Sequence, residues 1–123
     1  MADEARELAI RVILLPKDTN AHGTIFGGVI MSQIDLAGAV EARRHTAHRV
    51  VTVAMDAMKF LQPVYVGDIV SFYTRLVRCG RSSVRVKVEV EAQRNERPHE
   101  IIQVTEAEAV YVAIDGQGKS TPL

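Results

Sequence analysis

Hydrophobic positions divide the chain into a short strand, a long helix and four further strands. Residues 8–15 are mostly apolar and stop at Pro16, which indicates a short strand. From Pro16 to Gly28 the chain is rich in Asp, Asn and Gly, so we expect a connection there. Between Gly28 and Arg43 apolar residues fall nearly all round a helical wheel. This pattern predicts a helix that is buried on every side and wrapped by the rest of the chain.

The second half of the chain has the patterns of strands. Residues 50–60 are rich in Val and Met, and residues 68–78 alternate between apolar and polar. Residues 84–90 alternate Val with charged residues, which is typical of a half-buried strand. Residues 101–114 mix helix-favouring and strand-favouring parts, and we expect a strand; residues 79–83 contain a Gly suited to a hairpin. The sequence therefore predicts an α+β fold, with an antiparallel meander curved around one helix.

Length, charge and composition exclude several function classes. The chain has 123 residues with 15 basic and 15 acidic ones, so we expect one domain, residues 1–123, with no net charge. A neutral protein lacks the basic field that nucleic acids and anionic membranes require. One cysteine and four scattered histidines give no metal-ligand pattern, so we expect no metal. The polar start and the lack of an apolar run of about 20 residues predict a cytoplasmic location.

Asp35 is the most unusual polar residue, because it lies in the middle of the predicted apolar helix. It cannot be an N-cap there, and apolar surroundings make a carboxylate a stronger base. Asp35 is therefore either a catalytic carboxylate or a structural one, bonded to a backbone amide or to a serine such as Ser32. Asp56 is a second candidate for a buried carboxylate, either structural or at an interface.

Gly27 and Gly28 stand at the predicted start of the same helix. The first N–H groups of a helix lack internal acceptors and carry the positive end of its dipole, so they can bind a carbonyl oxygen that becomes an oxyanion. Alternatively, the glycines only permit close packing. Gly27 and Asp35 would be about 12 Å apart on a helix, so one carbonyl reaches both only if Gly27 lies in a folded-back loop or a second chain contributes.

Two loop segments complete the candidate site. Asn20 is either a turn former or a group that holds water or substrate. The hairpin from Gly80 to Ser83 offers Arg81, two hydroxyl groups and exposed amides, which suit a phosphate or pyrophosphate. The alternative for Arg81 is a solvated side chain at a hairpin tip.

Several motifs, in order, resemble those of hotdog-fold acyl-CoA thioesterases, the bacterial YciA-type group in particular. Residues 18–35, with Phe-Gly-Gly at 26–28, resemble the signature of the family. Further blocks at 51–60, 63–68 and 80–83 follow in the family's order, and residues 105–119 resemble its closing strand. The resemblance extends over nearly the whole chain.

This resemblance implies a hotdog fold and an enzyme that hydrolyses acyl-CoA to a free acid and coenzyme A, without metal or other cofactor. It implies that Asp35 acts as general base or nucleophile, that an N–H of Gly27 or Gly28 polarises the thioester carbonyl, and that Asn20 of a partner subunit positions water or substrate. It also implies a homo-oligomer, with a dimer as the smallest active unit and a hexamer built as a trimer of dimers. The residues expected to contact coenzyme A are Gly80, Arg81, Ser82 and Ser83.

Two other functions are compatible with this fold. A hotdog hydratase or dehydratase would pair a His with the carboxylate, and the predicted helix contains no His. A non-catalytic acyl-CoA-binding module would usually carry an added regulatory segment, for which we expect no room in 123 residues.

Overall fold

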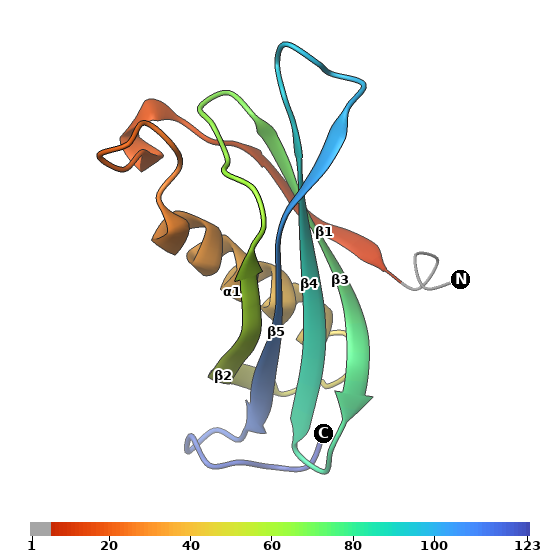
Figure 1. Cartoon of the computed structure of the whole chain (residues 1–123). Coiled ribbons are helices and arrows are strands. Elements are labelled where there is room, and N and C mark those ends of the chain that lie inside the picture. Colours follow the sequence, from red (N-terminus) through yellow and green to blue (C-terminus); the bar gives the residue numbers. More distant parts are fainter. Residues whose placement is uncertain (1–5) are drawn as a thin grey trace.

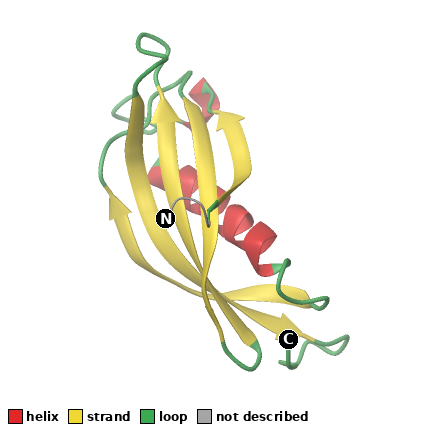
Figure 2. Ribbon diagram, turned by 90° about the vertical axis from the view of Figure 1, so that its right-hand side faces the viewer, coloured by secondary structure: helices red, strands yellow, loops and turns green. Residues whose placement is uncertain are grey.

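The computed structural model describes residues 6–123 as one long helix packed against one face of an antiparallel sheet of five strands (Figure 1 and Figure 2). The predicted α+β class is confirmed. In chain order the elements are β1 (Glu7–Ile13), a short 3-10 helix (Pro16–Asp18), α1 (Gly27–Ala42), β2 (Arg49–Phe60), β3 (Ile69–Cys79), β4 (Ser83–Gln93) and β5 (Ile101–Ile114).

The order of strands across the sheet is β1-β3-β4-β5-β2. β2 therefore pairs with β5 and lies at an edge, whereas β1 pairs with β3 at the other edge. The prediction of a simple meander was wrong for β2, which does not pair with β3, the next strand in sequence. The connection after Phe60 passes the ends of β5 and β4 before the chain enters β3.

The hydrophobic core lies between α1 and the inner face of the sheet. Val86 and Val88 of β4 are fully buried, and so are Phe72 of β3 and Ile34 of α1. β5 contributes alternate residues to the same core from Thr105 to Ala113, and Val104 is buried as well. Its helix-favouring residues, 105–109, form a strand nonetheless, because burial of alternate side chains outweighs local propensity.

α1 is buried on one side only. Ile34 and Ala37 face the sheet, whereas Met31, Leu36 and Val40 are 43%, 57% and 41% exposed. The prediction of a helix buried on every side was therefore wrong for a single chain, because one sheet covers one face of a helix (Figure 2). An apolar face of α1 is left without cover from residues 6–123.

Two further properties belong to residues 6–123. No helix in this range is long and apolar enough to cross a membrane. No three His, Cys, Asp or Glu side chains in the same range lie together as a set of metal ligands.

Candidate active site

The carboxylate of Asp35 lies where α1 meets β2 and β5. The hydroxyl of Thr52 in β2 donates a hydrogen bond to Asp35 Oδ1 at 2.6 Å. The hydroxyl of Tyr111 in β5 donates to the carbonyl oxygen of Asp35 at 2.7 Å and lies 3.4 Å from Oδ1. Ser32 is not a partner of Asp35, because its hydroxyl donates to the carbonyl oxygen of Val29. Asp35 is half-buried and has these two hydroxyl groups beside it, so the structure corrects the prediction of an apolar surround.

This arrangement fixes one oxygen of Asp35 and leaves the other free. Among residues 6–123, no hydrogen bond reaches Oδ2, whereas Oδ1 is held by Thr52. A carboxylate that is oriented through one oxygen and open at the other can accept a proton from water or attack a carbonyl carbon. The geometry of Asp35 therefore fits either chemical role expected for it.

Tyr111 reaches α1 because Gly38 has no side chain. A Cβ atom at Gly38 would lie 2.1 Å from the hydroxyl oxygen of Tyr111, far inside contact distance. Burial, and then the charge of the Asp35 carboxylate, raise the pKa of the Tyr111 hydroxyl above its ordinary value. The hydroxyl is therefore protonated at neutral pH and acts as a donor.

The N-terminus of α1 offers hydrogen-bond donors. Gly27 is the first residue of α1, and the N-cap residue Phe26 makes no side-chain hydrogen bond to the helix. The N–H groups of the first turn, those of Gly27 and Gly28 among them, therefore lack the side-chain acceptor that Ser or Asp would supply. A polarised carbonyl oxygen or an oxyanion suits this position.

A hollow of about 270 Å³ adjoins this end of α1. Its walls are mainly apolar and include Ile25, Ile30, Phe60 and Val64. The hydroxyl of Thr105 lines it as well and is buried without a hydrogen-bond partner among residues 6–123. An apolar group can therefore lie beside the free N–H groups of α1.

A single chain does not bring Gly27 and Asp35 into one site. Gly27 lines the hollow and Asp35 does not. Because Gly27 is part of α1, the two residues are separated by about 12 Å of helix. The alternative that Gly27 lies in a loop folded back over the helix was wrong. A second chain is the explanation left for a site that uses both residues.

Asn20 is held by hydrogen bonds within its own loop. Its Nδ2 donates to the hydroxyl of Thr24 at 2.9 Å, and its Oδ1 accepts from the N–H of His22 at 2.8 Å. Neither bond reaches Asp35 or the first turn of α1. The structure shows Asn20 as a turn former, and its role toward water or substrate stays a prediction.

The predicted hairpin between β3 and β4 is confirmed. The N–H of Gly80 donates to the carbonyl oxygen of Ser83 at 2.8 Å, and Arg81 at the tip is exposed. The N–H of Ala113 donates to the carbonyl oxygen of Ser82, so the hairpin lies beside the end of β5. Within the part of the chain that the structure describes, no hydrogen bond joins this hairpin to Asp35, and none of its residues lines the hollow at the start of α1. Its contact with coenzyme A stays a prediction.

Asp56, the other predicted buried carboxylate, is exposed. It pairs with Arg85 at 3.1 Å, and Arg85 also contacts Glu108 at 3.0 Å. The side chain lies at a bulged part of β2, where Ala57 has a positive φ of 50° and the strand register shifts. The structure therefore corrects the prediction for Asp56, which forms a surface ion pair.

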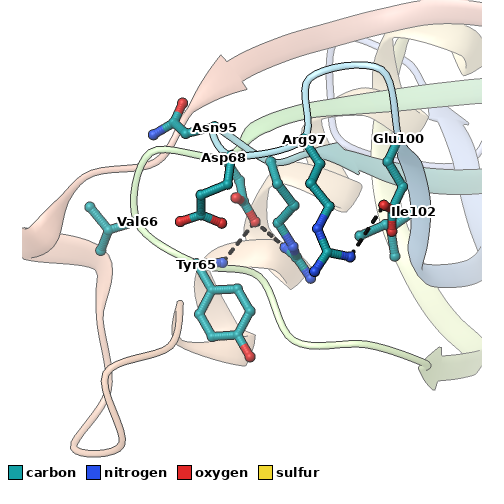
Figure 3. A pocket seen from close by; sticks show the side chains of 9 residues that line it. Tyr65, Val66, Asp68, Asn95, Arg97, Glu100 and Ile102 are labelled. Carbon is teal, nitrogen blue, oxygen red and sulfur yellow. Dashed lines mark hydrogen bonds and ion pairs between the residues drawn. The ribbon is translucent and has the colours of Figure 1, made fainter.

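Another hollow, of about 430 Å³, lies between the β2–β3 connection and the β4–β5 loop (Figure 3). Buried Asp68 forms an ion pair with Arg94 and accepts a hydrogen bond of 2.9 Å from the backbone N–H of Tyr65. Arg97 forms a second ion pair, with Glu100. The β4–β5 loop is thus anchored to its neighbour by a buried ion pair. Because Asp68, Arg94, Arg97 and Glu100 bind one another, most charged groups of this hollow are engaged in structural contacts.

Comparison with known proteins identifies the family. The model of the thioesterase superfamily matches residues 22–99. The chain belongs to the thioesterase superfamily. This thioesterase is 44% identical over 119 residues to the acyl-CoA thioester hydrolase YciA of Salmonella typhimurium, covering 95% of this chain and 90% of the relative. The predicted resemblance to YciA-type enzymes is therefore confirmed.

Solved structures give the same result for the fold. A hexameric hotdog fold thioesterase of Campylobacter jejuni matches this thioesterase with a TM-score of 0.90 and 45% identity, over 95% of this chain and 90% of that one. A hexameric thioesterase from Yersinia pestis matches with a TM-score of 0.89 and 44% identity, over 95% and 94% of the two chains. The predicted hotdog fold and the prediction of a thioesterase enzyme are confirmed.

The sequence motifs located Asp35 and the start of α1, but not the side chains that hold Asp35. Thr52 and Tyr111 were not recognised, since each lies in a strand whose pattern indicated only burial or pairing. A signal for Tyr111 was present in the sequence. Gly38 lies three residues after Asp35, on the same face of the helix, and marks a point where another side chain approaches closely.

Proposed function

We propose that this thioesterase hydrolyses acyl-CoA to a free carboxylic acid and coenzyme A. The observation that carries the proposal is the carboxylate of Asp35, oriented by Thr52 at 2.6 Å and free at Oδ2. The YciA relatives, which are acyl-CoA thioester hydrolases, support the choice of substrate. Coenzyme A is then part of substrate and product rather than a cofactor, and residues 1–123 act as one thioesterase domain.

In the proposed reaction, Asp35 acts as a general base or as the nucleophile. As a base it takes a proton from water, the water oxygen bonds to the thioester carbon, and N–H groups of Gly27 or Gly28 stabilise the oxyanion. The carbon–sulfur bond then breaks, and the sulfur leaves as a thiolate that takes up the proton. As a nucleophile, Asp35 bonds to the thioester carbon and the carbon–sulfur bond breaks, which releases coenzyme A as a thiolate that takes up a proton and leaves a mixed anhydride. Water then hydrolyses this anhydride to the free acid and the Asp35 carboxylate.

A single turnover in isotopically labelled water distinguishes these two routes. If Asp35 is the base, the labelled oxygen enters the carboxylic acid product. If Asp35 is the nucleophile and water attacks the side-chain carbonyl carbon of Asp35 in the anhydride, the label enters the protein. Mass spectrometry of the peptide that contains Asp35 then detects it.

We propose a dimer of identical chains as the smallest active unit. β2 is an edge strand with exposed apolar residues, and Val53 is 56% exposed, while Leu36 on α1 is 57% exposed. A second copy that pairs along β2 would extend the sheet and cover this apolar face. It would also let Gly27 and Asn20 of one chain meet Asp35 of the other. The Campylobacter and Yersinia thioesterases are hexameric, which supports a hexamer for this chain, and we propose that it is built as a trimer of such dimers.

A thiol-release assay with a panel of acyl-CoA substrates tests the proposed reaction. We expect hydrolysis by the unmodified protein and a fall in kcat of about 10²–10⁴-fold in Asp35→Asn, because general-base catalysis contributes that much. Water addition to an enoyl-CoA without thiol release would instead identify a hydratase. Binding of acyl-CoA without any reaction would identify a binding module.

Analytical ultracentrifugation tests the proposed dimer. Val53→Lys places a charge on the exposed edge of β2 and is expected to yield a smaller species with little activity. Ile101→Lys is the matched control, because Ile101 is also 56% exposed but lies at the start of β5. Equal masses for both variants and the unmodified protein would exclude β2 as the interface.

A further inference from the structure

A hollow of about 530 Å³ lies where α1 ends and β2 begins. It is bounded on its apolar side by Ala39 and Val50, and its polar side chains are those of Arg43, Thr46, His48 and Arg49. None of the sequence motifs pointed to this junction, and it is separate from the hollow at the start of α1.

The lining of this hollow can be strongly positive. No carboxylate lines it, and neither Arg43 nor Arg49 forms an ion pair with a described residue. The nearest acidic groups on adjoining elements are engaged elsewhere. Glu41 binds Arg44 and His45. Asp115, which is close enough to His48 to interact with it electrostatically, accepts N–H groups of its own turn.

The net charge of the chain makes a local cluster of this kind significant. With 15 basic and 15 acidic residues, the molecule has no overall positive field to attract an anion. A polyanionic ligand must therefore be bound by a few positive side chains gathered in one place. Two guanidinium groups with free donors can bind phosphate oxygens in a bidentate manner.

The position of the hollow relative to Asp35 matches the shape of the proposed substrate. Ala39 follows Asp35 by one turn of α1, and Val50 lies two residues before Thr52 on β2. Arg43 is about 12 Å beyond Asp35 along the helix, and its long side chain extends the separation. In an acyl-CoA, a long flexible pantetheine arm likewise separates the thioester from the phosphates.

The β3–β4 hairpin lies at the same end of the sheet. Arg49 of β2 pairs with Ile114 at the end of β5, and Ser83 at the start of β4 pairs with Val112. The hairpin with exposed Arg81 and the hollow therefore flank the end of β5. Figure 1 shows the β3–β4 connection and the start of β2 at this end, opposite the β4–β5 loop.

We propose that the hollow at the α1–β2 junction binds the phosphate groups of coenzyme A through Arg43 and Arg49. The proposal rests on the proposed acyl-CoA hydrolysis and adds the site that holds the nucleotide end of the substrate. Thr46 supports it with a hydroxyl: its oxygen accepts the N–H of His48 at 3.1 Å, which leaves the hydroxyl proton available to a phosphate oxygen.

The test compares two substrates that share an acyl group, an acyl-CoA and the corresponding acyl-pantetheine, which has no phosphates. Arg43→Gln and Arg49→Gln are each expected to raise KM for acyl-CoA about 10-fold with little change in kcat, since a lost charge-assisted hydrogen bond weakens ground-state binding. Both variants should hydrolyse acyl-pantetheine like the unmodified protein. Arg97→Gln, at the opposite end of the sheet, is the matched control and should change neither KM.

Each other outcome identifies which proposal is wrong. An unchanged KM for acyl-CoA in a variant that combines Arg43→Gln with Arg49→Gln, with hydrolysis intact, would overturn the phosphate site alone. An equal rise in KM for acyl-pantetheine would also overturn it, because the effect would not depend on phosphates. Absence of hydrolysis of both substrates by the unmodified protein would contradict the proposed function itself, and binding of coenzyme A measured by calorimetry would then test the site independently.

Discussion

Tyr111 in β5 holds the backbone of Asp35 in α1 through a hydrogen bond of 2.7 Å from its hydroxyl to the Asp35 carbonyl oxygen. The residues are 76 positions apart in the sequence, so this bond joins the last strand to the middle of the helix. Tyr111 is 1% exposed, and an unpaired hydroxyl at such a position would be costly. The bond therefore serves both the packing of α1 and the placement of the proposed catalytic carboxylate.

Tyr111→Phe is expected to change how the free energy of unfolding depends on pH. The pKa of Tyr111 is raised in the folded state by burial and by the Asp35 carboxylate, so above about pH 10, the ordinary tyrosine pKa, the folded state binds more protons than the unfolded state. The contribution of the Tyr111 hydroxyl to the free energy of unfolding is fully present below that pH and falls as the pH rises beyond it. Urea unfolding between pH 8 and about 11, at a fixed protein concentration, measures the effect. An equally steep alkaline decline in Tyr111→Phe would contradict this account.

Gly38→Ala is expected to destabilise the protein by about 1–3 kcal/mol, a typical cost of overpacking a core. The new Cβ would lie 2.1 Å from the Tyr111 hydroxyl oxygen and would push the hydroxyl off α1. We also expect a lower kcat, because the Asp35 backbone would lose its partner. Gly116→Ala provides the control, since no atom lies within 4 Å of its added Cβ. Similar urea midpoints for the two variants would show that α1 and β5 can separate without cost.

Thr52→Val is expected to lower kcat about 10-fold with little change in KM, because the carboxylate of Asp35 loses a charge-assisted hydrogen bond that orients it. The bond is 2.6 Å long and joins β2 to α1. Thr52→Ser keeps the hydroxyl and should retain most of the activity. Steady-state kinetics of both variants provide the measurement, and equal activity of the Val and Ser variants would rule out an orienting role.

Asp68→Asn is expected to destabilise the protein by about 3 kcal/mol, because it leaves the charge of Arg94 without its buried partner. Asp68 is 2% exposed and joins the β2–β3 connection to the β4–β5 loop. Glu100→Gln removes an exposed pair with Arg97 in the same loop and should cost no more than about 0.5 kcal/mol. Denaturant unfolding of the two variants checks the difference, and equal losses would show that burial of the Asp68 pair has no special effect.

Local patterns in the sequence predicted the secondary structure closely. The predicted helix, from Gly28 to Arg43, differs from α1 by one residue at each end, because two glycines and a change of composition mark its limits. β4 was predicted from its alternating valines. The place of β2 beside β5 was not predicted, since pairing between distant strands depends on the assembled core and leaves no short-range pattern.

The candidate site was predicted to a similar degree. Asp35 was found because an acidic residue contradicts the apolar pattern of its helix. Its partners were missed because Thr52 and Tyr111 lie 17 and 76 residues away and belong to strands with ordinary patterns. The exposed face of α1 could not be predicted either. A helix that is apolar on all sides has the same sequence pattern whether its second face is buried by its own chain or by another copy.

Phe26 at the N-cap of α1 leaves the folded protein less stable than it could be. A Ser or Asp at this position would typically add about 1 kcal/mol by accepting N–H groups of the first turn, and those are the groups that a thioester carbonyl would need. Stability and affinity thus compete for the same few donors. Selection for heat resistance alone would favour a polar residue at position 26. Its side chain would then already accept the N–H groups of the first turn of α1 when the substrate arrives.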